Sequence, residues 1–462
     1  AELRLTEDEI RTKAPRYFEL LHPEPLDIAQ ARQFLRDDEA FVLIVPGPYA
    51  THVMVISTEE IIWHRPEWRI GEIETAARRI LFDVGAKLEL SAEEAELWYQ
   101  NPAAGDGASF DRETAHALYN QLFAPLEPLL ASKRHVFVAG TGTLSSLPFG
   151  MLVIDPPEGS DSDPNALRNT RWLADQHALI QMPSLQALAF LRGQKAVRQR
   201  QGIRSFIGIG DPLLEGAPAG RAARDNRSGS ASPGDSGELF GDASSGVGQK
   251  LADVERIRAL SRLPGTQAEL RALQSAFAAP DANLLLAERA TEANVRRLDL
   301  RADILVFATH GLLASDPQGS GEPGLVLTPP NLATQFDDGF LSMTEIAALE
   351  IDADWVVLSA CNTAASDGSM SQSGLSGIAR AFFFAGARNL LASHWPVHDD
   401  AAAELTVRTV QYLQSDAGLS RAEAFQHAMR SLRNDNASDG WAHPAAWAPF
   451  TLIGDGASMA NR

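Results

Sequence analysis

A histidine and the chain's only cysteine each follow directly after an apolar, strand-like run. Residues 304–309 stop at His310, and residues 355–360 stop at Cys361, 51 positions further along the chain. Reactive side chains of parallel sheets gather beyond the carboxyl ends of the strands, so two neighbouring strands would bring the imidazole and the thiol together. An imidazole can take the thiol proton and later protonate a leaving amine, so this pair predicts nucleophilic attack on a carbonyl carbon.

The glycine after the histidine adds a second feature of acyl-transfer chemistry. The amide of Gly311 is unhindered by a side chain, and together with the amide of Cys361 it would form an oxyanion hole for a tetrahedral intermediate. A structural interpretation stands beside this one, because free cysteines are often buried and histidines at strand ends are often hydrogen-bonded core residues.

The elements that must position these residues alternate regularly from residue 251 onward. Helical patterns are expected at 254–263, 267–277, 291–299 and 373–385, and strand patterns at 283–286, 304–309, 355–360 and 389–393. Strands that alternate with helices indicate a mostly parallel sheet with both faces covered. We therefore predict an α/β fold.

The chain before residue 200 predicts a further α/β unit. Short β-branched runs at 41–45, 53–57 and 61–64 indicate an antiparallel meander, and helical patterns follow at 70–84 and 110–130. Residues 216–250 contain 8 Gly and 6 Ser and hardly any large apolar side chain, which predicts a disordered loop. We expect two domains, residues 1–200 and residues 201–462, with this loop inside the second.

The composition of the chain argues against several classes of protein and of binding partner. The formal net charge of −20 at pH 7 repels phosphate backbones and anionic lipids, so we expect no bound nucleic acid. One cysteine allows no internal disulfide, and no apolar run approaches the roughly 18 residues of a membrane span. We expect a cytoplasmic protein that binds no membrane. Because the chain starts at Ala1 rather than Met, we also expect that residues before it were removed.

Two other kinds of pattern do not predict sites. His394 and His398 are four residues apart, but Pro396 between them argues against a shared helix face and no third ligand is evident, so we predict no metal site. The glycine-containing turns at 140–142 and 208–210 lack a complete phosphate-binding motif. We predict no cofactor.

Several ordered motifs together resemble those of CHAT domains, which are caspase-like bacterial proteins related to separase. The motifs are His310-Gly311, the run 358–363 around Cys361, and the segments 377–382, 385–388, 395–397 and 447–455. Weaker matches at 147–149, 210–212 and 290–292 extend the resemblance upstream, so that it spans residues 15–456. The separation of His310 and Cys361 is also close to the spacing of about 50 residues found in caspases.

The resemblance implies a fold and an activity. The fold would be a caspase-like, mostly parallel sheet flanked by helices, with a degenerate caspase-like unit at the N-terminus that supports the active one. The activity would be that of a cysteine endopeptidase that cleaves a protein substrate through Cys361 and His310. In many members a tetratricopeptide or other sensor region precedes the domain, so a regulatory sensor or partner protein is expected.

The resemblance also implies where substrate specificity lies. In caspase relatives, the loop after the strand that follows the nucleophile helix helps to form the P1 pocket, and here that loop contains Trp395 and Asp399. Asp399 occupies a place similar to an acidic residue of separases, which cleave after arginine, so a basic P1 residue is expected. The alternative is that Asp399 and Asp400 only start the next helix, a position that Asp fills well.

Two other functions remain compatible with the same expected fold. A non-catalytic interaction module would have the caspase-like shape without a physical requirement for either His310 or Cys361. A thiol-dependent acyltransferase would use the same two residues, but it would need a pocket for a carrier molecule, and we find no pattern that predicts one.

Overall fold

The computed structural model describes residues 27–47, 49–86, 88, 90–99, 109–193, 205–216, 251–312, 322–359, 377–395, 399–416 and 418–456. The strands of the main sheet are β1 (Glu39–Pro46), β2 (Thr51–Ile56), β3 (Ile61–His64), β4 (His135–Ala139), β5 (Ala178–Gln181), β6 (Phe206–Pro212), β7 (Leu284–Ala287), β8 (Leu300–Ala308), β12 (Ile351–Ser359), β13 (Asn389–Ser393) and β14 (Phe450–Gly454). A second, three-stranded sheet consists of β9 (Gly311–Leu312), β10 (Gly324–Val326) and β11 (Phe340–Ser342).

Helices separate most of these strands. In the first half they are α3 (Ile28–Gln33), α4 (Ile70–Asp83), α5 (Ala92–Tyr99), α6 (Arg112–Leu122), α7 (Glu127–Leu130), α8 (Pro164–Asn169), α9 (Leu173–Gln176) and α10 (Leu185–Gly193). In the second half they are α11 (Val254–Arg258), α12 (Pro264–Phe277), α13 (Glu292–Arg297), α14 (Met343–Ala347), α15 (Gly377–Ala385), α16 (Asp399–Ser415), α17 (Arg421–Arg433) and α18 (Pro444–Trp447). Among the described helices, none is both long and apolar enough to cross a membrane.

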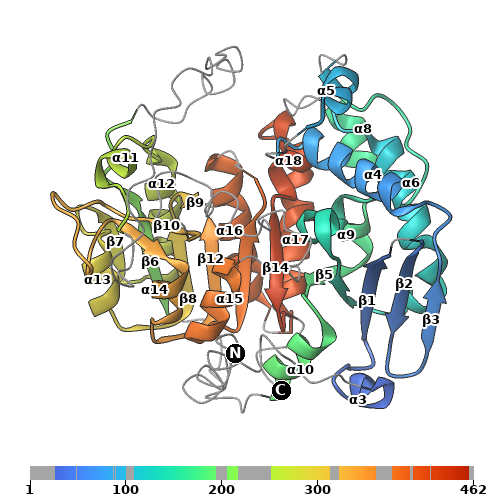
Figure 1. Cartoon of the computed structure of the whole chain (residues 1–462), viewed down its shortest axis with the longest axis horizontal. Helices are drawn as coiled ribbons and strands as arrows, with labels where there is room; N and C mark the ends of the chain where they lie inside the picture. The colour runs from blue at the N-terminus through green and yellow to red at the C-terminus, as the bar shows by residue number, and fades with distance from the viewer. Residues whose placement is uncertain are drawn as a thin grey trace, which may run out of the picture.

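The main sheet runs through the whole molecule in the order β3-β2-β1-β4-β5-β14-β13-β12-β8-β6-β7 (Figure 1). The strands β7, β6, β8, β12 and β13 are parallel to one another, and β1, β4 and β5 form a second parallel group. The predicted α/β fold, a mostly parallel sheet flanked by helices, is confirmed. The predicted meander is confirmed too, because β1, β2 and β3 pair in antiparallel order.

The last strand joins the two parallel groups. β14 pairs antiparallel with β13 and parallel with β5, where the single register pair is Ile453 with Gln181. The two groups therefore point in opposite directions, and their carboxyl ends lie at opposite edges of the sheet. Strands from both predicted domains share this sheet, and the domain boundary near residue 200 stays a prediction.

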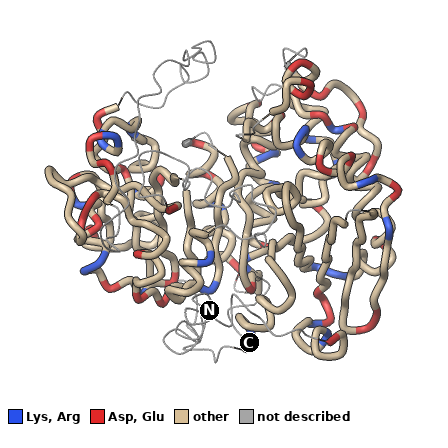
Figure 2. Tube along the Cα trace, in the orientation of Figure 1, with Lys and Arg blue, Asp and Glu red and all other residues tan. Residues whose placement is uncertain are grey.

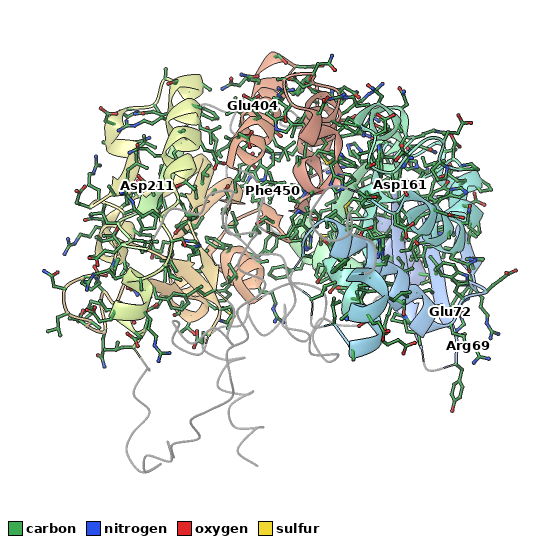
Figure 3. All side chains as sticks on the ribbon, turned by 90° about the horizontal axis from the view of Figure 1, so that it is seen from above. Arg69, Glu72, Asp161, Asp211, Glu404 and Phe450 are labelled. Carbon is green, nitrogen blue, oxygen red and sulfur yellow. The ribbon has the colours of Figure 1, made fainter. Side chains whose placement is uncertain are left out.

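Both faces of the central strands are buried. In β8, Ile304 and Val306 belong to the core cluster that includes residues of α12 and α16, whereas Leu305 and Phe307 belong to the cluster that includes residues of α14 and α15. Figure 3, viewed from above, shows helices on both sides of the sheet. Alternate side chains of a strand point to opposite faces, so the near-continuous apolar run of β8 follows directly from this sandwiched position.

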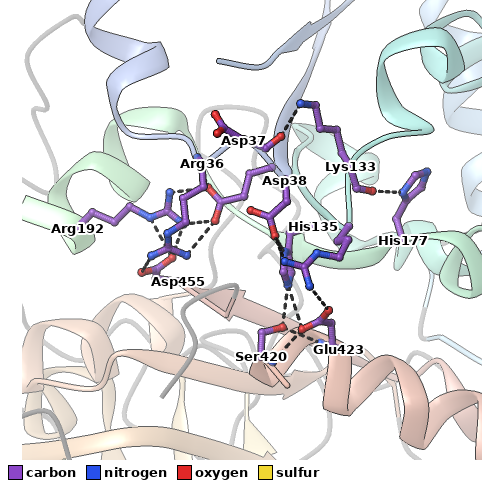
Figure 4. A network of polar contacts seen from close by, with 12 residues as sticks. Arg36, Asp37, Asp38, Lys133, His135, His177, Arg192, Ser420, Glu423 and Asp455 are labelled. Carbon is purple, nitrogen blue, oxygen red and sulfur yellow. Dashed lines mark hydrogen bonds and ion pairs between the residues drawn. The ribbon is translucent and has the colours of Figure 1, made fainter. Parts of the chain in front are cut away.

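Charged residues occur mainly on the helices and loops around the central strands (Figure 2). An exception is an ion-pair network around the buried Glu39 that ties three elements together (Figure 4). Arg192 of α10 reaches Glu39 at 2.7 Å and Asp455 at 3.0 Å, and Arg36 reaches Glu39 at 3.0 Å. Glu39 is completely buried at the start of β1, and Asp455 follows β14. The network therefore fixes the residue after β14 against the first strand.

A second polar cluster joins β4 to the start of α17 (Figure 4). His135 Nε2 lies 2.8 Å from Ser420 Oγ and 3.6 Å from a carboxylate oxygen of Glu423. Ser420 caps α17, because its Oγ accepts a hydrogen bond from Glu423 N while the Glu423 carboxylate accepts one from Ser420 N. This arrangement connects the two halves of the sheet through side chains as well as through backbone.

The predicted loop 216–250 lies outside the described residues except for Gly216. Gly216 N donates to the carbonyl oxygen of Leu260 at 3.1 Å, and Glu215 N donates to that of Arg258 at 2.7 Å. These two hydrogen bonds dock the segment after β6 against the segment after α11.

A glycine-to-alanine exchange at Gly386 should destabilise the chain. Gly386 follows α15 with a φ of +115°, and a Cβ atom there would collide with the carbonyl oxygen of Ile351 at the start of β12. We expect Gly386→Ala to lose more than about 2 kcal/mol of unfolding free energy. The matched control is Gly71→Ala in α4, where a Cβ meets nothing within 4 Å, and it should be neutral or stabilise by about 0.4–1 kcal/mol. Equal unfolding midpoints of the two variants by circular dichroism would contradict this account.

Stability should also fall in acid, with Glu423 contributing part of the loss. Its hydrogen bond with His135 lowers the pKa of Glu423 from 4.5 to about 2, although burial opposes the shift. A carboxyl whose pKa is depressed by folding stabilises the protein above its unfolded pKa, and that contribution is lost as the pH falls through the folded pKa. Glu423→Gln should therefore cost about 1–2 kcal/mol at pH 7 after allowance for solvent screening, and the variant should lose less stability than wild type between pH 4.5 and 2.

Urea unfolding at pH 7, 4.5 and 3 measures this difference. Glu404→Gln is the control, because Glu404 is half-exposed and pairs with Arg408 within one helix, where such a pair contributes at most about 0.5 kcal/mol. Parallel pH dependences of wild type and Glu423→Gln would show that the cluster at the start of α17 contributes nothing through its charge.

Candidate active site

The carboxyl ends of three neighbouring strands meet at one edge of the sheet. β8 pairs with β12 in parallel from Leu300 opposite Ile351 to Ala308 opposite Ser359. On the other side of β8, Gly210 near the end of β6 lies opposite Ala308. The predicted neighbourhood of the two strands that precede His310 and Cys361 is therefore observed. Cys361 itself, and Ala360 before it, lie outside the described residues.

His310 is half-buried just beyond β8, and its ring forms a hydrogen bond with the backbone. Nε2 of His310 lies 2.7 Å from the carbonyl oxygen of Ser261. A carbonyl oxygen can only accept, so Nε2 carries the hydrogen, and in the neutral imidazole the lone pair is then on Nδ1. The contact selects the tautomer in which Nδ1 is the basic atom.

The backbone around His310 is held by the small second sheet. Val326 N of β10 donates to the carbonyl oxygen of His310 at 2.9 Å, and Thr309 Oγ1 donates to the carbonyl oxygen of Val326 at 2.5 Å. Gly311 of β9 stands opposite Leu325 of β10. Because hydrogen-bonded and non-bonded pairs alternate in an antiparallel ladder, the bond from Val326 to His310 leaves the N–H of Gly311 pointing away from β10.

A buried carboxylate lies beneath the end of β12. Ser359, the last residue of that strand, donates through Oγ to Glu269 of α12 at 3.0 Å, and Glu269 is 1% exposed. The bond anchors β12 to the helix that covers it, two residues before the position of the cysteine in the sequence. Sequence reasoning did not single out Glu269, because a glutamate within an amphipathic helix ordinarily faces solvent.

The loop after β13 begins with two buried residues. His394 Nε2 lies 2.8 Å from Thr451 Oγ1, and burial lowers the pKa of His394 to about 3, so this imidazole is neutral. Trp395 is fully buried and donates through Nε1 to the carbonyl oxygen of Ala445 at 3.2 Å. Both side chains anchor the loop, and a role of Trp395 in substrate binding stays a prediction.

The other predicted residue of this loop lies at a helix start. Asp399 is the first residue of α16, rather than the residue before it, and its side chain is outside the described part of the structure. His398 is also outside it. In the described ranges, no three His, Cys, Asp or Glu side chains gather in a group that could hold a metal ion.

A second residue of this edge was missed by sequence reasoning as a site candidate. Asp211, labelled in Figure 3, is the penultimate residue of β6, is only 5% exposed and has a φ of +47°. The signal was present, because an acidic residue at the carboxyl end of a buried strand lies at the same edge of the sheet as the predicted histidine.

Two other features of the molecule carry no site. Asp38, His135 and Ser420 have the residue types of a hydrolase triad, but Ser420 is completely buried and caps α17, so a substrate cannot reach it.

An apolar cavity of about 40 Å³ lies where β5 and β14 diverge, lined by residues such as Ile180, Phe425 and Leu452. None of its lining residues belongs to β6, β8 or β12.

Comparison with known proteins agrees with the family that the motifs suggested. A model of the CHAT domain matches residues 112–455. Tetratricopeptide repeat protein 28 of Homo sapiens is 25% identical over 373 residues, which cover 75% of this chain and 13% of that protein. The protein of the same name from Mus musculus is 28% identical over 197 residues, covering 37% of this chain and 8% of that protein. The chain thus spans a small part of the length of these relatives.

Solved structures show similar overall architecture at low identity. The separase–securin complex of Saccharomyces cerevisiae matches with a TM-score of 0.46 and 10% identity, covering 97% of this chain and 31% of that chain. The complex of the pro- and mature domains of RgpB from Porphyromonas gingivalis matches with a TM-score of 0.39 and 11% identity, covering 91% of this chain and 79% of that chain. Because the family model covers well over half of its residues, the chain belongs to the CHAT domain family and has the expected caspase-like α/β fold.

Proposed function

We propose that this chain is a cysteine endopeptidase that cleaves a protein substrate, with Cys361 as nucleophile and His310 as general base. The observation that carries the proposal is the register of β8 and β12. Every register pair of the ladder joins residues 51 positions apart, up to Ala308 and Ser359. If the same register continues for two more residues, His310 and Cys361 stand opposite each other at the sheet edge.

The hydrogen bond from His310 Nε2 to the Ser261 carbonyl supports the role of the base. It leaves Nδ1 free of a proton in the neutral ring, and a base must accept its proton on such an atom. In acylation, the thiol proton passes to Nδ1, the sulfur attacks the scissile carbonyl carbon, and Nδ1–H then protonates the departing amine. In deacylation, Nδ1 takes a proton from water, the hydroxide cleaves the thioester, and the thiol is regenerated.

The amide of Gly311 supports the stabilisation of the intermediate. Because its N–H points away from β10, it is not used in that ladder and is oriented for an oxyanion formed beside His310. The amide of Cys361 would supply the second donor. Two preorganised donors of this kind typically account for a large share of the rate enhancement in acyl transfer.

The proposal extends to substrate specificity and regulation. We propose cleavage after a basic P1 residue, with Asp399 and Trp395 in the loop that forms part of the pocket, and a net charge of −20 favours cationic protein segments as substrates. We also propose control by a sensor or partner protein. The curated relatives are named for tetratricopeptide repeats, whose stacked helix pairs form extended binding surfaces.

One observation favours a second function, a non-catalytic interaction module. The names of the two curated relatives refer to a repeat protein and to no peptidase activity. A module of this kind needs the sheet and the surfaces of its loops, but it needs neither a fixed histidine tautomer nor a thiol. The two functions therefore differ in what removal of the thiol does.

Replacement of either member of the pair should abolish cleavage without unfolding the chain. We expect Cys361→Ala and His310→Ala each to lower kcat/KM by at least about 10³-fold, since the nucleophile and its base act as one unit. Cleavage of a diverse peptide library, followed by mass spectrometry, measures activity and the position of the cut at once. A thiol alkylator should inhibit wild type to the same extent.

The control is His52→Ala on β2, which lies at the far end of the sheet and should retain wild-type activity. Circular dichroism should show folded protein for all three variants. Retained cleavage in Cys361→Ala or His310→Ala would contradict the assignment of Cys361 as nucleophile and His310 as base. A folded wild type that cleaves no peptide in the library would favour the interaction module.

A further inference from the structure

β6 approaches β8 closely at the edge where His310 lies. A Cβ atom on Gly210 would collide with the carbonyl oxygen of Ala308, so only glycine allows this approach. Gly210 stands opposite Ala308, the last pair of the register between the two strands. Asp211 comes directly after this pair on β6 and His310 two residues after it on β8, so both are carried by the carboxyl ends of neighbouring strands.

One carboxylate oxygen of Asp211, Oδ1, is buried without a hydrogen-bond partner among the described residues. The residue as a whole is 5% exposed. Burial raises the pKa of Asp211, an effect that the charge of Arg262 opposes. Buried carboxylates in native proteins are normally paired or hydrogen-bonded, so an oxygen that lacks a partner calls for a reason.

The backbone of Asp211 is unusual in the same place. Its φ of +47° lies in the left-handed region, which few non-glycine residues adopt, although aspartate and asparagine do so more readily than most. β6 also shifts its register against β7 between Gly210 and Pro212. Such an irregularity at a strand end re-aims a side chain, and here it directs a carboxylate instead of continuing the regular alternation.

The charge that opposes the rise in the pKa of Asp211 comes from the segment that orients the base. Arg262 is exposed, no ion pair joins it to Asp211, and it directly follows Ser261, whose carbonyl oxygen binds His310 Nε2. The charge that acts on Asp211 is thus one residue from the carbonyl group that orients the base. A cation that arrives from outside would supply the partner that the described residues do not.

We propose that Asp211 binds the cationic side chain of the substrate residue whose carbonyl is attacked, a lysine or arginine at P1. This inference rests on the proposed peptidase function and names the residue that recognises its basic P1 side chain. A carboxylate that is already desolvated forms a charge-assisted hydrogen bond with a guanidinium or ammonium group at little further cost. The same carboxylate rejects an apolar P1 residue, because that residue would leave it buried and unpaired. Asp399 lies after β13, beyond β12, and is the competing candidate.

Labelling of the thiol by peptidyl chloromethyl ketones tests this assignment. Three probes with the same peptide carry arginine, its neutral isostere citrulline, or leucine at P1, and intact mass spectrometry gives the labelling rate of Cys361. We expect wild type to prefer arginine over citrulline by at least 10-fold. This comparison needs no substitution, so it holds even if a variant fails to fold.

Asp211→Asn should reduce the arginine-to-citrulline ratio to near 1 while the leucine probe still labels. Asn tolerates the left-handed conformation about as well as Asp, so the fold should survive. The control for net charge is Asp281→Asn, an exposed acid paired with Arg271, which should leave the ratio unchanged.

The outcomes separate this inference from the proposed function. Labelling by all three probes with equal arginine and citrulline rates in wild type would overturn the role of Asp211 and leave the peptidase assignment standing. Loss of the preference in Asp399→Asn but not in Asp211→Asn would overturn it in favour of the loop after β13. Absence of labelling by every probe in folded wild type would overturn the peptidase function and this inference together.

Discussion

The ladder between β8 and β12 is the constraint on which the rest of the structure depends. It runs in one register from Leu300 opposite Ile351 to Ala308 opposite Ser359, and both strands are buried on both faces. A slip of one residue would turn every side chain of a strand to the other face, so the two core clusters on either side of the sheet specify the register strongly. The positions that follow the two strands are therefore set by core packing. The loops supply the residues at these positions, but the positions themselves are set by the packing of the strands.

The local elements could be predicted from sequence, whereas their order in the sheet could not. β13 has the predicted bounds, and Thr291 caps α13 as its residue type suggested, because apolar periodicity and capping are local properties. The insertion of β14 between β5 and β13 depends on pairing between residues far apart in the chain, with a single register pair to β5. The small sheet of β9, β10 and β11 was missed because strands of two or three residues are too short to show a period.

The candidate site shows the same division between local and tertiary information. His310 could be predicted because it follows an apolar strand, and this signal needs no knowledge of other segments. The carbonyl of Ser261 that orients its ring could not be predicted, since every residue has a carbonyl group and only the fold selects one. The burial of Asp211 could not be predicted either, because an aspartate before a proline is typical of an exposed turn. The complete burial of Trp395 could not be predicted either, because it depends on the packing of the loop after β13 against residues 445–451, far along the chain.

β6 links the proposed recognition of the substrate to the orientation of the base. Asp211 lies at its end, and the segment directly after it docks through Glu215 and Gly216 onto residues 258–260, next to Ser261. A cation bound by Asp211 would stabilise this strand end, and the strand end supports the carbonyl that fixes the His310 tautomer. Binding energy from the P1 side chain would then be used to order the base as well as to hold the substrate. Interactions of this kind raise kcat and not only the affinity for the substrate, because the ordered base is needed in the transition state rather than in the first encounter.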